Sequence, residues 1–336
     1  MVKVLVARLD NAGDVLITGP AVRAVAAGAD SVTMLAGPHG RAAAEVLPGV
    51  DEVVTWCAPW IDPEPPAITR EHLDELRDRV RAGNFDKALI FTSFHQSALP
   101  LALLLRECGV PWIGAISEDY PGALLDLRHR VDGDPPEPER ALSLARAAGF
   151  ELPPGDDGRL AVRRPLPDVS HLVGEPGYVV VHPAASVPAR QWPAEHNAEA
   201  VRLLAESGYR VVVTGGRGEA ALTARVAGDT AVDLTGATTF AELAAVLAGA
   251  RALVAPNTGP AHLAAAVGTP VVSLFAPVVP AERWAPYGVP VVLLGDQDAP
   301  CRDTRARVCP VPGHPCLAGV TPEDVCQAVE KLGGAA

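Results

Sequence analysis

The stretch VAPNTGPAHLAAAVGTPVVSLFAP, residues 254–277, decides the fold class because it joins a strand, a tight turn and a helix. The apolar run 252–255 predicts a buried parallel strand that ends at Pro256-Asn257. Thr258-Gly259-Pro260 then opens an alanine-rich helix, and residues 271–275 predict the next buried strand. In an open α/β sheet the loop after a strand lies at the edge where ligands bind, so this turn is a candidate site.

The start of the predicted helix suits an anionic ligand. Its first N–H groups have no partners within the helix and carry partial positive charge. The small residues Thr258, Gly259 and Ala261 let a ligand approach the backbone, and His262 can donate a hydrogen bond to a phosphate oxygen. The alternative is an ordinary strand, turn and helix in which His262 is a half-buried histidine with its own partners.

Composition narrows the class of protein. The chain has 336 residues, 49% of them hydrophobic, which is enough for two ordinary domain cores. A formal net charge of -12 without a basic tract argues against nucleic acid as a partner. No apolar run is long enough to span a membrane, and the opening MVKVLVARLD enters a strand without a signal peptide. We therefore expect a cytoplasmic protein with no transmembrane segment, which leaves peripheral membrane contact open.

The first half alternates between strands and helices, which predicts a doubly wound α/β domain. Asn11 and Asp14 lie after the first strand, residues 2–7, and before a helix expected over 15–27. Asp14 can cap that helix, which alone is the better supported role, or it can present a carboxylate to a ligand. The other expected elements are strands 31–35, 51–55, 87–91 and 111–114 and helices 38–47, 68–82 and 139–148, with 117–138 as a loop region.

Polar residues also follow the strand expected over 87–91. Ser93 and His95 should lie at the same edge of the sheet as Asn11, so these three residues are candidates to contact an acceptor substrate. A capped helix start explains the serine as well. The interdomain linker is expected within residues 162–175.

The second half repeats the alternation and contains a long loop, residues 182–193. A loop of this length between a strand and a helix is unusual and suggests a function. In it Ser186 can donate to a phosphate and Arg190 can hold one bidentately, although a lone arginine is more often a solvated surface residue. The expected elements are strands 178–181 and 210–214, a strand at Val232, and helices 193–206, 218–227 and 240–247.

A second glycine-rich turn, Thr214-Gly215-Gly216-Arg217-Gly218, lies between a strand and a helix. It lacks the full GxGxxG pattern, so it is a weak nucleotide signal and does not predict a nicotinamide cofactor. This absence disfavours a Rossmann-type oxidoreductase. A two-lobed binding protein that closes on a nucleotide or sugar without catalysis remains an alternative.

Five motifs together resemble glycosyltransferase family 9, the heptosyltransferases, in the right order over nearly the whole chain. They are GDVLITGPAVRAV (13–25), ARQWP (189–193), TGGRGE (214–219), the segment from DLTGATTF to SLFAP (233–277), and CPVPGHPCLAGVTPEDV (309–325). The resemblance implies the α/β GT-B architecture, two Rossmann-like doubly wound domains facing across a cleft. It implies an acceptor-binding domain over 1–165, a nucleotide-sugar-binding domain over 175–320, and a C-terminal helix within 321–336 that crosses back towards the first domain.

The resemblance also implies a reaction. We expect an inverting transferase, without metal or other cofactor, that moves a sugar from a nucleotide sugar, usually ADP-heptose, to a hydroxyl of a glycan, lipid-linked or secondary-metabolite acceptor. Asp14 matches the family's aspartate after the first strand and would act as general base. The leaving ADP would be stabilised by donor-binding residues. These are Ser186, Arg190, Asn257, Thr258, Gly259, Pro260, Ala261 and His262, with Thr214, Gly215 and Glu219, and more loosely residues 235–238, near the nucleoside.

The chain departs from the family at two of these positions. The family commonly has lysine where this chain has Arg190 and aspartate where it has Asn257. Arginine keeps the charge, whereas asparagine loses a charge expected to face the hydroxyls of the donor sugar. In a cytoplasmic protein we expect the tail cysteines to be reduced, and their spacing favours packing over zinc binding. They are Cys301, Cys309, Cys316 and Cys326.

Overall fold

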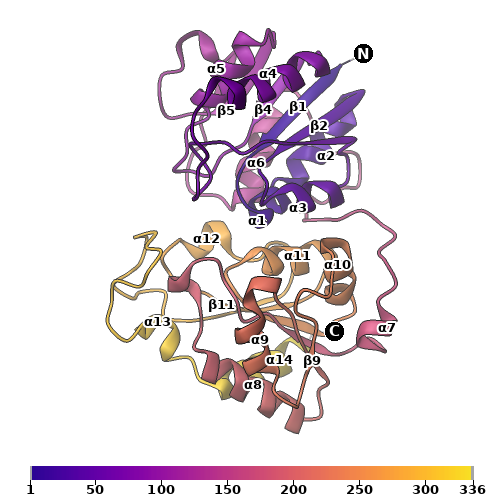
Figure 1. Cartoon of the computed structure of the whole chain (residues 1–336), viewed down its shortest axis with the longest axis vertical. Coiled ribbons are helices and arrows are strands. Elements are labelled where there is room, and N and C mark those ends of the chain that lie inside the picture. The colour runs from indigo at the N-terminus through magenta and orange to yellow at the C-terminus, as the bar shows by residue number, and fades with distance from the viewer. Residues whose placement is uncertain (1, 334–336) are drawn as a thin grey trace. The chain divides into compact units, whose positions relative to one another are not determined.

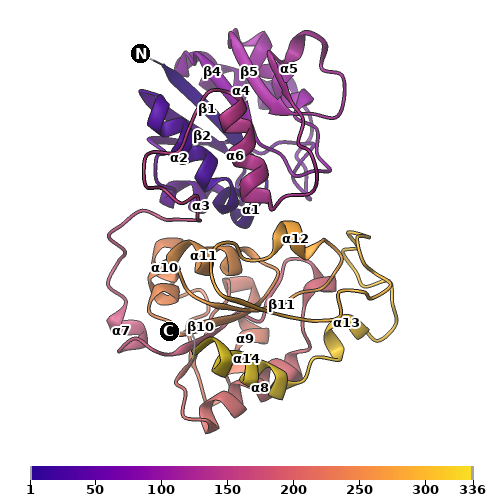
Figure 2. The same ribbon diagram turned by 180° about the vertical axis from the view of Figure 1, so that it is seen from behind.

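The computed structural model describes residues 2–333, so Met1 and residues 334–336, which belong to the expected terminal ranges, lie outside the described part. The chain divides between Arg163 and Arg164 into two compact units, here called the first and the second domain. Both are doubly wound parallel α/β domains (Figures 1 and 2). Among the described residues, no helix is both long enough and apolar enough to cross a membrane.

The first domain contains a six-stranded parallel sheet with the order β3-β2-β1-β4-β5-β6. Alternate residues of β1 face opposite sides of the sheet, and Leu5 and Ala7 pack with Leu76 and Leu101 of the helices α4 and α5. The strands are β1 (Lys3–Arg8), β2 (Ser31–Ala36), β3 (Glu52–Thr55), β4 (Lys87–Ile90), β5 (Trp112–Ile116) and β6 (Leu127–His129). The helices are α1 (Ala12–Ile17), α2 (Gly19–Gly28), α3 (Arg41–Val46), α4 (Arg70–Gly83), α5 (Leu99–Glu107), α6 (Glu137–Ala147) and the 3-10 turn η1 (Gly122–Leu124).

The second domain has a sheet with the order β12-β11-β10-β7-β8-β9. One face packs against α8, α9 and α14, through residues such as Val181, Val201 and Val329. The strands are β7 (Val179–Val181), β8 (Val211–Val213), β9 (Val232–Asp233), β10 (Ala252–Pro256), β11 (Val271–Leu274) and β12 (Val291–Leu294). The helices are α7 (Ser170–Val173), α8 (Ala194–Glu206), α9 (Ala220–Ala227), α10 (Phe240–Ala248), α11 (Gly259–Val267), α12 (Ala281–Trp284), α13 (Pro315–Ala318) and α14 (Pro322–Gly333), with 3-10 turns η2 (Pro188–Arg190) and η3 (Arg217–Glu219).

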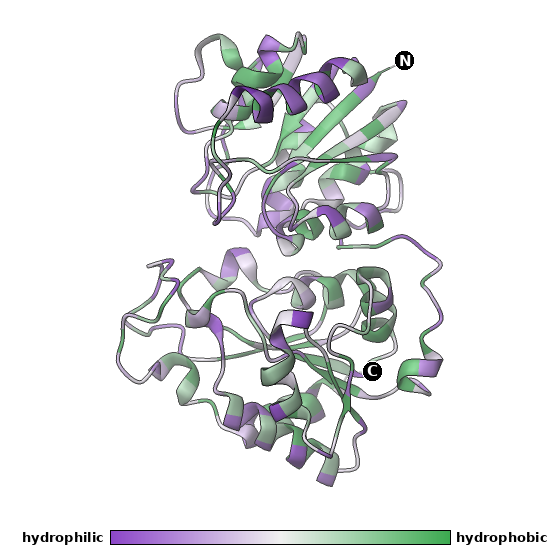
Figure 3. Cartoon of the chain, viewed as in Figure 1, coloured by the Kyte–Doolittle hydropathy of each residue, from purple (hydrophilic) through white to green (hydrophobic). Residues whose placement is uncertain are grey.

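The two sheets have the same topology. Counted from its own first strand, each domain has the order 3-2-1-4-5-6, the order of dinucleotide-binding folds. The strand order reverses between β1 and β4 in the first domain and between β7 and β10 in the second. Hydrophobic residues dominate these central strands, whereas the polar residues gather on outer helices such as α4 (Figure 3). In such folds ligands bind beyond the carboxyl ends of the strands at the reversal point, which is where the loops after β1, β4, β7 and β10 lie.

Several element predictions need correction, and helix α5 was not predicted at all. The helix expected over 15–27 is two helices that meet at Thr18, because Pro20 has no N–H to continue the hydrogen-bond ladder. The expected loop 117–138 contains β6, a short edge strand whose residues 127–129 are only half-buried and give a weak pattern. The strand β12 was missed although its residues, VVLL, are all apolar.

The C-terminal helix α14 packs against α8 and the strands β10, β11 and β12 of its own domain. Val325 and Val329 are fully buried in this contact. The helix therefore belongs to the second domain by its contacts, and its expected approach to the first domain stays a prediction.

Candidate active site

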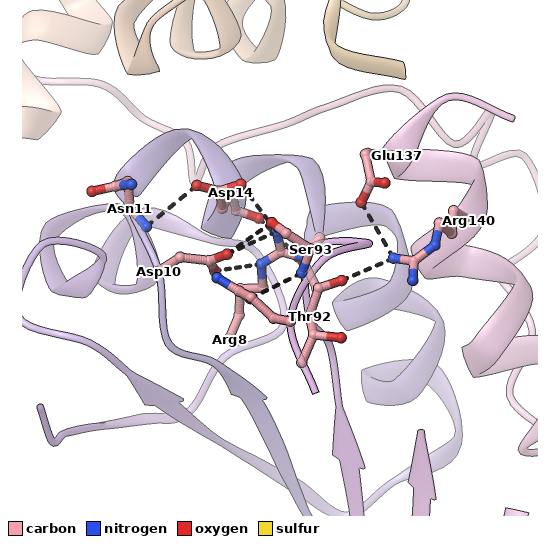
Figure 4. A network of polar contacts seen from close by, with 10 residues as sticks. Arg8, Asp10, Asn11, Asp14, Thr92, Ser93, Glu137 and Arg140 are labelled. Atoms are coloured by element: carbon pink, nitrogen blue, oxygen red, sulfur yellow. Dashed lines mark hydrogen bonds and ion pairs between the residues drawn. The ribbon is translucent and has the colours of Figure 1, made fainter. Parts of the chain in front are cut away.

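In the first domain, the polar cluster at the reversal point is built around Arg8, the last residue of β1 (Figure 4). The side chain is 1% exposed, so its charge needs partners within the protein. Its Nε donates to Oδ1 of Asp10 at 2.6 Å, and its Nη2 donates to Oδ2 of the same carboxylate at 3.2 Å. Arg8 and Asp10 thus form a bidentate, buried ion pair.

Asp14 is the second carboxylate that Arg8 holds. Nη2 of Arg8 donates to its Oδ1 at 3.0 Å, and the backbone N–H of Asn11 donates to its Oδ2 at 3.3 Å. Its side chain is 17% exposed, compared with 8% for Asp10, so Asp14 is the more accessible of the two. Asn11, not Asp14, is the N-cap of α1, and Asp14 occupies the third helical position. The carboxylate thus combines a contact at the helix start with partial exposure to solvent.

Of the three residues predicted to contact the acceptor substrate, Ser93 is buried in this cluster, whereas Asn11 and His95 are exposed. Ser93 accepts a hydrogen bond from Nη2 of Arg8 at 2.9 Å and donates to Oδ2 of Asp10 at 3.0 Å. The structure therefore places Ser93 inside the ion-pair network, because Phe91, two residues before it, continues the pairing of β4 with β1 by donating to the carbonyl of Ala7.

Electrostatics keep Arg8 charged. Burial lowers its pKa, but the negative charges of Asp10, Asp14 and Glu137 outweigh burial and raise the pKa above its usual value. Burial raises the pKa of Asp10, the charge of Asp14 adds to this effect, and Arg8 opposes it. Both carboxylate oxygens of Asp10 accept hydrogen bonds and neither donates one, which is the pattern of an ionised carboxylate.

Helix α6 supplies the other charges near this cluster. Glu137 is 1% exposed and pairs with Nη1 of Arg140 at 3.4 Å. Arg140 also donates to the carbonyl oxygen of Thr92 at 2.8 Å, which ties α6 to the loop after β4. Arg8, Asp10, Glu137 and Arg140 were not predicted as site residues. A charged residue that ends an otherwise apolar strand, as Arg8 does, was the available signal.

In the second domain, the corresponding place is the start of α11, directly after β10. Asn257 is buried, and Thr258 is the N-cap of the helix, with no side-chain hydrogen bond to its first turn. Ala261 donates to the carbonyl oxygen of Thr258, and Pro260 has no N–H. Residues 258–260 are half-buried, so solvent reaches the first turn of α11, and its role as an anion site stays a prediction.

Arg190 and His262 meet at this helix start. Nη1 of Arg190 donates to the carbonyl oxygen of Asn257 at 3.4 Å. Burial, together with the nearby charge of Arg190, lowers the pKa of His262 to about 4, so the imidazole is neutral at pH 7. Its Nδ1 is buried and has no hydrogen-bond partner among residues 2–333. The half-buried histidine with its own partners, the alternative interpretation, does not describe this side chain.

The loop that carries Arg190 is fixed by the C-terminal tail. Nε2 of His314 lies 3.0 Å from the carbonyl oxygen of Ala189, and Nε1 of Trp192 donates to the carbonyl oxygen of Val320 at 3.2 Å. The loop is therefore held on both sides of Arg190. Ser186, on the same loop, is exposed. The tail motif, residues 309–325, therefore supports the Arg190 loop through His314 and Val320.

The predicted nucleoside residues already have neighbours within the second domain. Oγ1 of Thr214 lies 3.0 Å from Nδ1 of His182, a buried histidine whose pKa burial lowers to about 4. Glu219 accepts the N–H of Gly216 at 2.6 Å. A side chain at Gly215 would lie 2.6 Å from the methyl group of Thr223, so packing alone requires glycine there. Nucleoside contacts at Thr214, Gly215 and Glu219 remain predictions.

The tail cysteines lie in and around the core of the second domain. Cys301 and Cys316 are 1% exposed and pack in the same hydrophobic cluster, with Cys309 and Cys326 at its border. Burial is the main cause that raises the pKa of Cys316 to about 12, with the neighbouring thiols Cys301 and Cys309 adding to it. Within residues 2–333, no group of three or more histidine, cysteine or acidic side chains is arranged to hold a metal ion.

Comparison of the sequence with known proteins gives a consistent result. Residues 74–314 match the model of glycosyltransferase family 9 (heptosyltransferase). Lipopolysaccharide heptosyltransferase 3 of Escherichia coli is 31% identical over 199 residues, 56% of this chain and 55% of that protein. Lipopolysaccharide heptosyltransferase 1 of E. coli K12 is 26% identical over 298 residues, 83% of this chain and 89% of that protein. The matched region thus spans about half of the first relative and most of the second.

Solved structures share the fold. The family 9 glycosyl transferase from Veillonella parvula superposes with a TM-score of 0.82 at 18% identity, covering 99% of this chain and 98% of that one. E. coli heptosyltransferase WaaC with ADP-2-deoxy-2-fluoro heptose superposes with a TM-score of 0.73 at 22% identity, covering 98% and 99%. These matches and the two doubly wound domains confirm the predicted GT-B fold class. Because the family model covers well over half of the chain, the protein belongs to glycosyltransferase family 9, and the predicted enzyme class is confirmed.

Proposed function

We propose that this protein is an inverting, metal-independent glycosyltransferase that moves a heptose from ADP-heptose to a hydroxyl group of a glycan, lipid-linked or secondary-metabolite acceptor in the cytoplasm. The observation that carries the proposal is the set of hydrogen-bond donors that meets at the start of α11. Arg190, the first turn of the helix and the unpartnered Nδ1 of His262 gather at a helix N-terminus. Such a combination suits a diphosphate.

The reaction needs a proton acceptor and a stabilised leaving group. The acceptor hydroxyl gives its proton to Asp14 as its oxygen forms a bond to the anomeric carbon. The bond from this carbon to the diphosphate breaks, and ADP leaves with the bonding electron pair. Arg190 and the N–H groups of α11 stabilise the negative charge that develops on ADP.

The choice of ADP is supported by relatives. The E. coli enzyme WaaC, similar in fold, has been solved with ADP and with ADP-2-deoxy-2-fluoro heptose. The sugar is the less supported part, because Asn257 stands where the family commonly has aspartate. Asparagine can still accept and donate hydrogen bonds to sugar hydroxyls, so it favours a neutral, polyhydroxylated sugar.

Thermal shift with nucleotides tests the donor. ADP and ADP-heptose should raise the melting temperature more than UDP or GDP, since a ligand at a hundred times its dissociation constant adds about 2.7 kcal/mol of stability. Equal shifts with all three diphosphates would contradict the choice of ADP. ADP release from ADP-heptose, measured with acceptor glycans and with EDTA present, then tests transfer. Strong ADP-heptose binding without any ADP release would favour the non-catalytic binding protein, and loss of release in EDTA would contradict metal independence.

A further inference from the structure

Arg8 donates hydrogen bonds to two carboxylates, two to Asp10 and one to Asp14. Its Nη2 faces three acceptors, Oδ1 of Asp14 at 3.0 Å, Oδ2 of Asp10 at 3.2 Å and Oγ of Ser93 at 2.9 Å. This nitrogen has only two hydrogens, so the three acceptors share them. Asp10 additionally takes the whole of the Nε hydrogen bond at 2.6 Å and receives the hydroxyl proton of Ser93 in a hydrogen bond. Asp10 is thus the main counter-ion of Arg8, and Asp14 is its second partner (Figure 4).

This division has a chemical consequence for a general base. An arginine that faced Asp14 alone would stabilise its ionised form strongly and make it a poor proton acceptor. A neighbouring carboxylate that pairs with the same arginine offsets this effect and adds repulsion of its own. We propose that Asp10 tunes Asp14 in this way: it neutralises most of the charge of Arg8, so that Arg8 can position Asp14 without making it too weak a base. The proposal rests on the assignment of Asp14 as the base.

The other charged groups packed around α1 are paired among themselves. Helix α1 contacts α2, α3 and α6. Charged residues on these helices include Arg23, which pairs with Asp156 of a loop, Arg41, which pairs with Glu45, Glu137, which pairs with Arg140, and Arg146, which pairs with Glu151. Each of these pairs is neutral as a whole. Among the acidic residues that raise the pKa of Arg8, Glu137 has a smaller effect than Asp10 and Asp14. Asp10 is therefore the group whose removal changes the charge next to Asp14 most directly.

A titration by carbon NMR measures the effect without a substrate. The full-length protein is labelled at the side-chain carboxyl carbon of aspartate, and the signal of Asp14 is identified by its absence in Asp14→Asn. In Asp10→Asn the midpoint of the Asp14 signal should move to lower pH by about one unit or more, because a neighbouring negative charge is lost and Arg8 turns its full charge to Asp14. An unchanged or higher midpoint would overturn the proposal.

Two matched variants separate charge from structure. Ser93→Ala removes a hydrogen bond of the same network but no charge, and Asp156→Asn removes the partner of Arg23, another partly buried arginine–aspartate pair of the same domain. Both should leave the Asp14 midpoint within a few tenths of a pH unit of the unaltered protein. If Asp156→Asn moved the midpoint as far as Asp10→Asn, a general loosening would explain the shift and the proposal would fail. Asp10→Ser gives the same charge change should Asp10→Asn fold poorly.

Turnover distinguishes this proposal from the one on which it rests. In an ADP-release assay the acid limb of the kcat/KM profile should move in Asp10→Asn by the same interval as the NMR midpoint. If Asp14→Asn keeps full turnover, the base assignment is wrong, whatever the NMR titration shows. If Asp14→Asn is inactive and the acid limb of Asp10→Asn does not move, Asp14 stands as the base and the tuning role of Asp10 is wrong.

Discussion

The two domains have the same strand order but carry opposite chemistry at the reversal point. In the first domain, the loops after β1 and β4 bring together Arg8, two carboxylates and Ser93, all hydrogen-bonded to one another. In the second, the loops after β7 and β10 bring Arg190 to the start of α11, where His262 is neutral. Topology thus gives each domain a place for a site, and side chains decide what it does.

The difference concerns protons and anions. Carboxylates in the first domain can accept a proton but repel a phosphate, whereas the second domain offers donors at α11 and no acidic residue from 257 to 267. We infer a division of labour, with proton transfer in the first domain and nucleotide binding in the second. The following changes break one side of this comparison at a time.

The largest effect is expected from Asp14→Asn. Loss of a general base typically lowers the rate by about a hundred- to ten-thousand-fold. Asparagine can still accept the N–H of Asn11, so helix α1 should keep its first turn and the melting temperature should change little. ADP release under saturating donor measures the effect. Near-normal turnover would remove Asp14 from the mechanism, and a large fall in melting temperature would assign it a structural role.

Arg190→Ala should weaken nucleotide binding by the second domain. A charge-assisted hydrogen bond contributes about 1.5 to 3 kcal/mol, so ADP should bind roughly ten-fold or more weakly. Arg190→Lys keeps the charge but loses the bidentate geometry, so its affinity for ADP should lie between those of the unaltered protein and Arg190→Ala. Fluorescence or calorimetric titration with ADP reports the affinities. An affinity equal to that of the unaltered protein would show that Arg190 is only a surface residue.

Acid should destabilise the second domain more strongly than the first, where burial also lowers the pKa of His129. The folded pKa of His182 and of His262 is about 4, below the usual 6.5, so the unfolded chain binds protons first as the pH falls. Stability is therefore lost between about pH 6.5 and 4, by on the order of 3 kcal/mol for each histidine. Asp126 and Asp156 of the first domain, whose pKa values are lowered, keep their contribution until the pH falls below about 3.8.

Urea unfolding at pH 7, 5.5 and 4.5 measures this dependence. His182→Gln removes one titrating group, so the stability lost between pH 7 and 4.5 should be visibly smaller than in the unaltered protein. Tyr209→Phe is a control in the same domain that removes no group titrating in this range. It should leave the pH dependence of the free energy of unfolding unchanged. A pH dependence identical in all three proteins would show that the buried histidines do not cause it.

The smallest effect is expected from Ser186→Ala. Ser186 is exposed, so water can replace much of its hydrogen bond to the phosphate, and ADP affinity should fall only about two- to ten-fold. Calorimetric titration next to Arg190→Ala checks the order of the two effects. A greater loss in Ser186→Ala than in Arg190→Ala would reverse the roles assigned to this loop.

Much of the fold was predictable because parallel strands are apolar throughout and their helices end at glycine or proline. The alternation and the helix start at α11 followed from this pattern, whereas the role expected of Asp14 came from the family resemblance and stays a prediction. The pattern could not show that Arg8 is buried, since an arginine at the end of a strand is usually solvated. Its burial depends on Ser93, 85 positions later in sequence, which β4 brings beside β1. The support of the Arg190 loop by His314 and Val320 depends in the same way on distant segments.

Calorimetric titration of ADP into the unaltered protein, Asp14→Asn and Arg190→Ala under one condition tests the division of labour most directly. The account predicts that Asp14→Asn binds ADP with unchanged affinity, because the nucleotide is held by the second domain. It predicts that Arg190→Ala binds roughly ten-fold or more weakly. A loss of ADP affinity in Asp14→Asn as large as that in Arg190→Ala, in a protein with an unchanged melting temperature, would contradict the account.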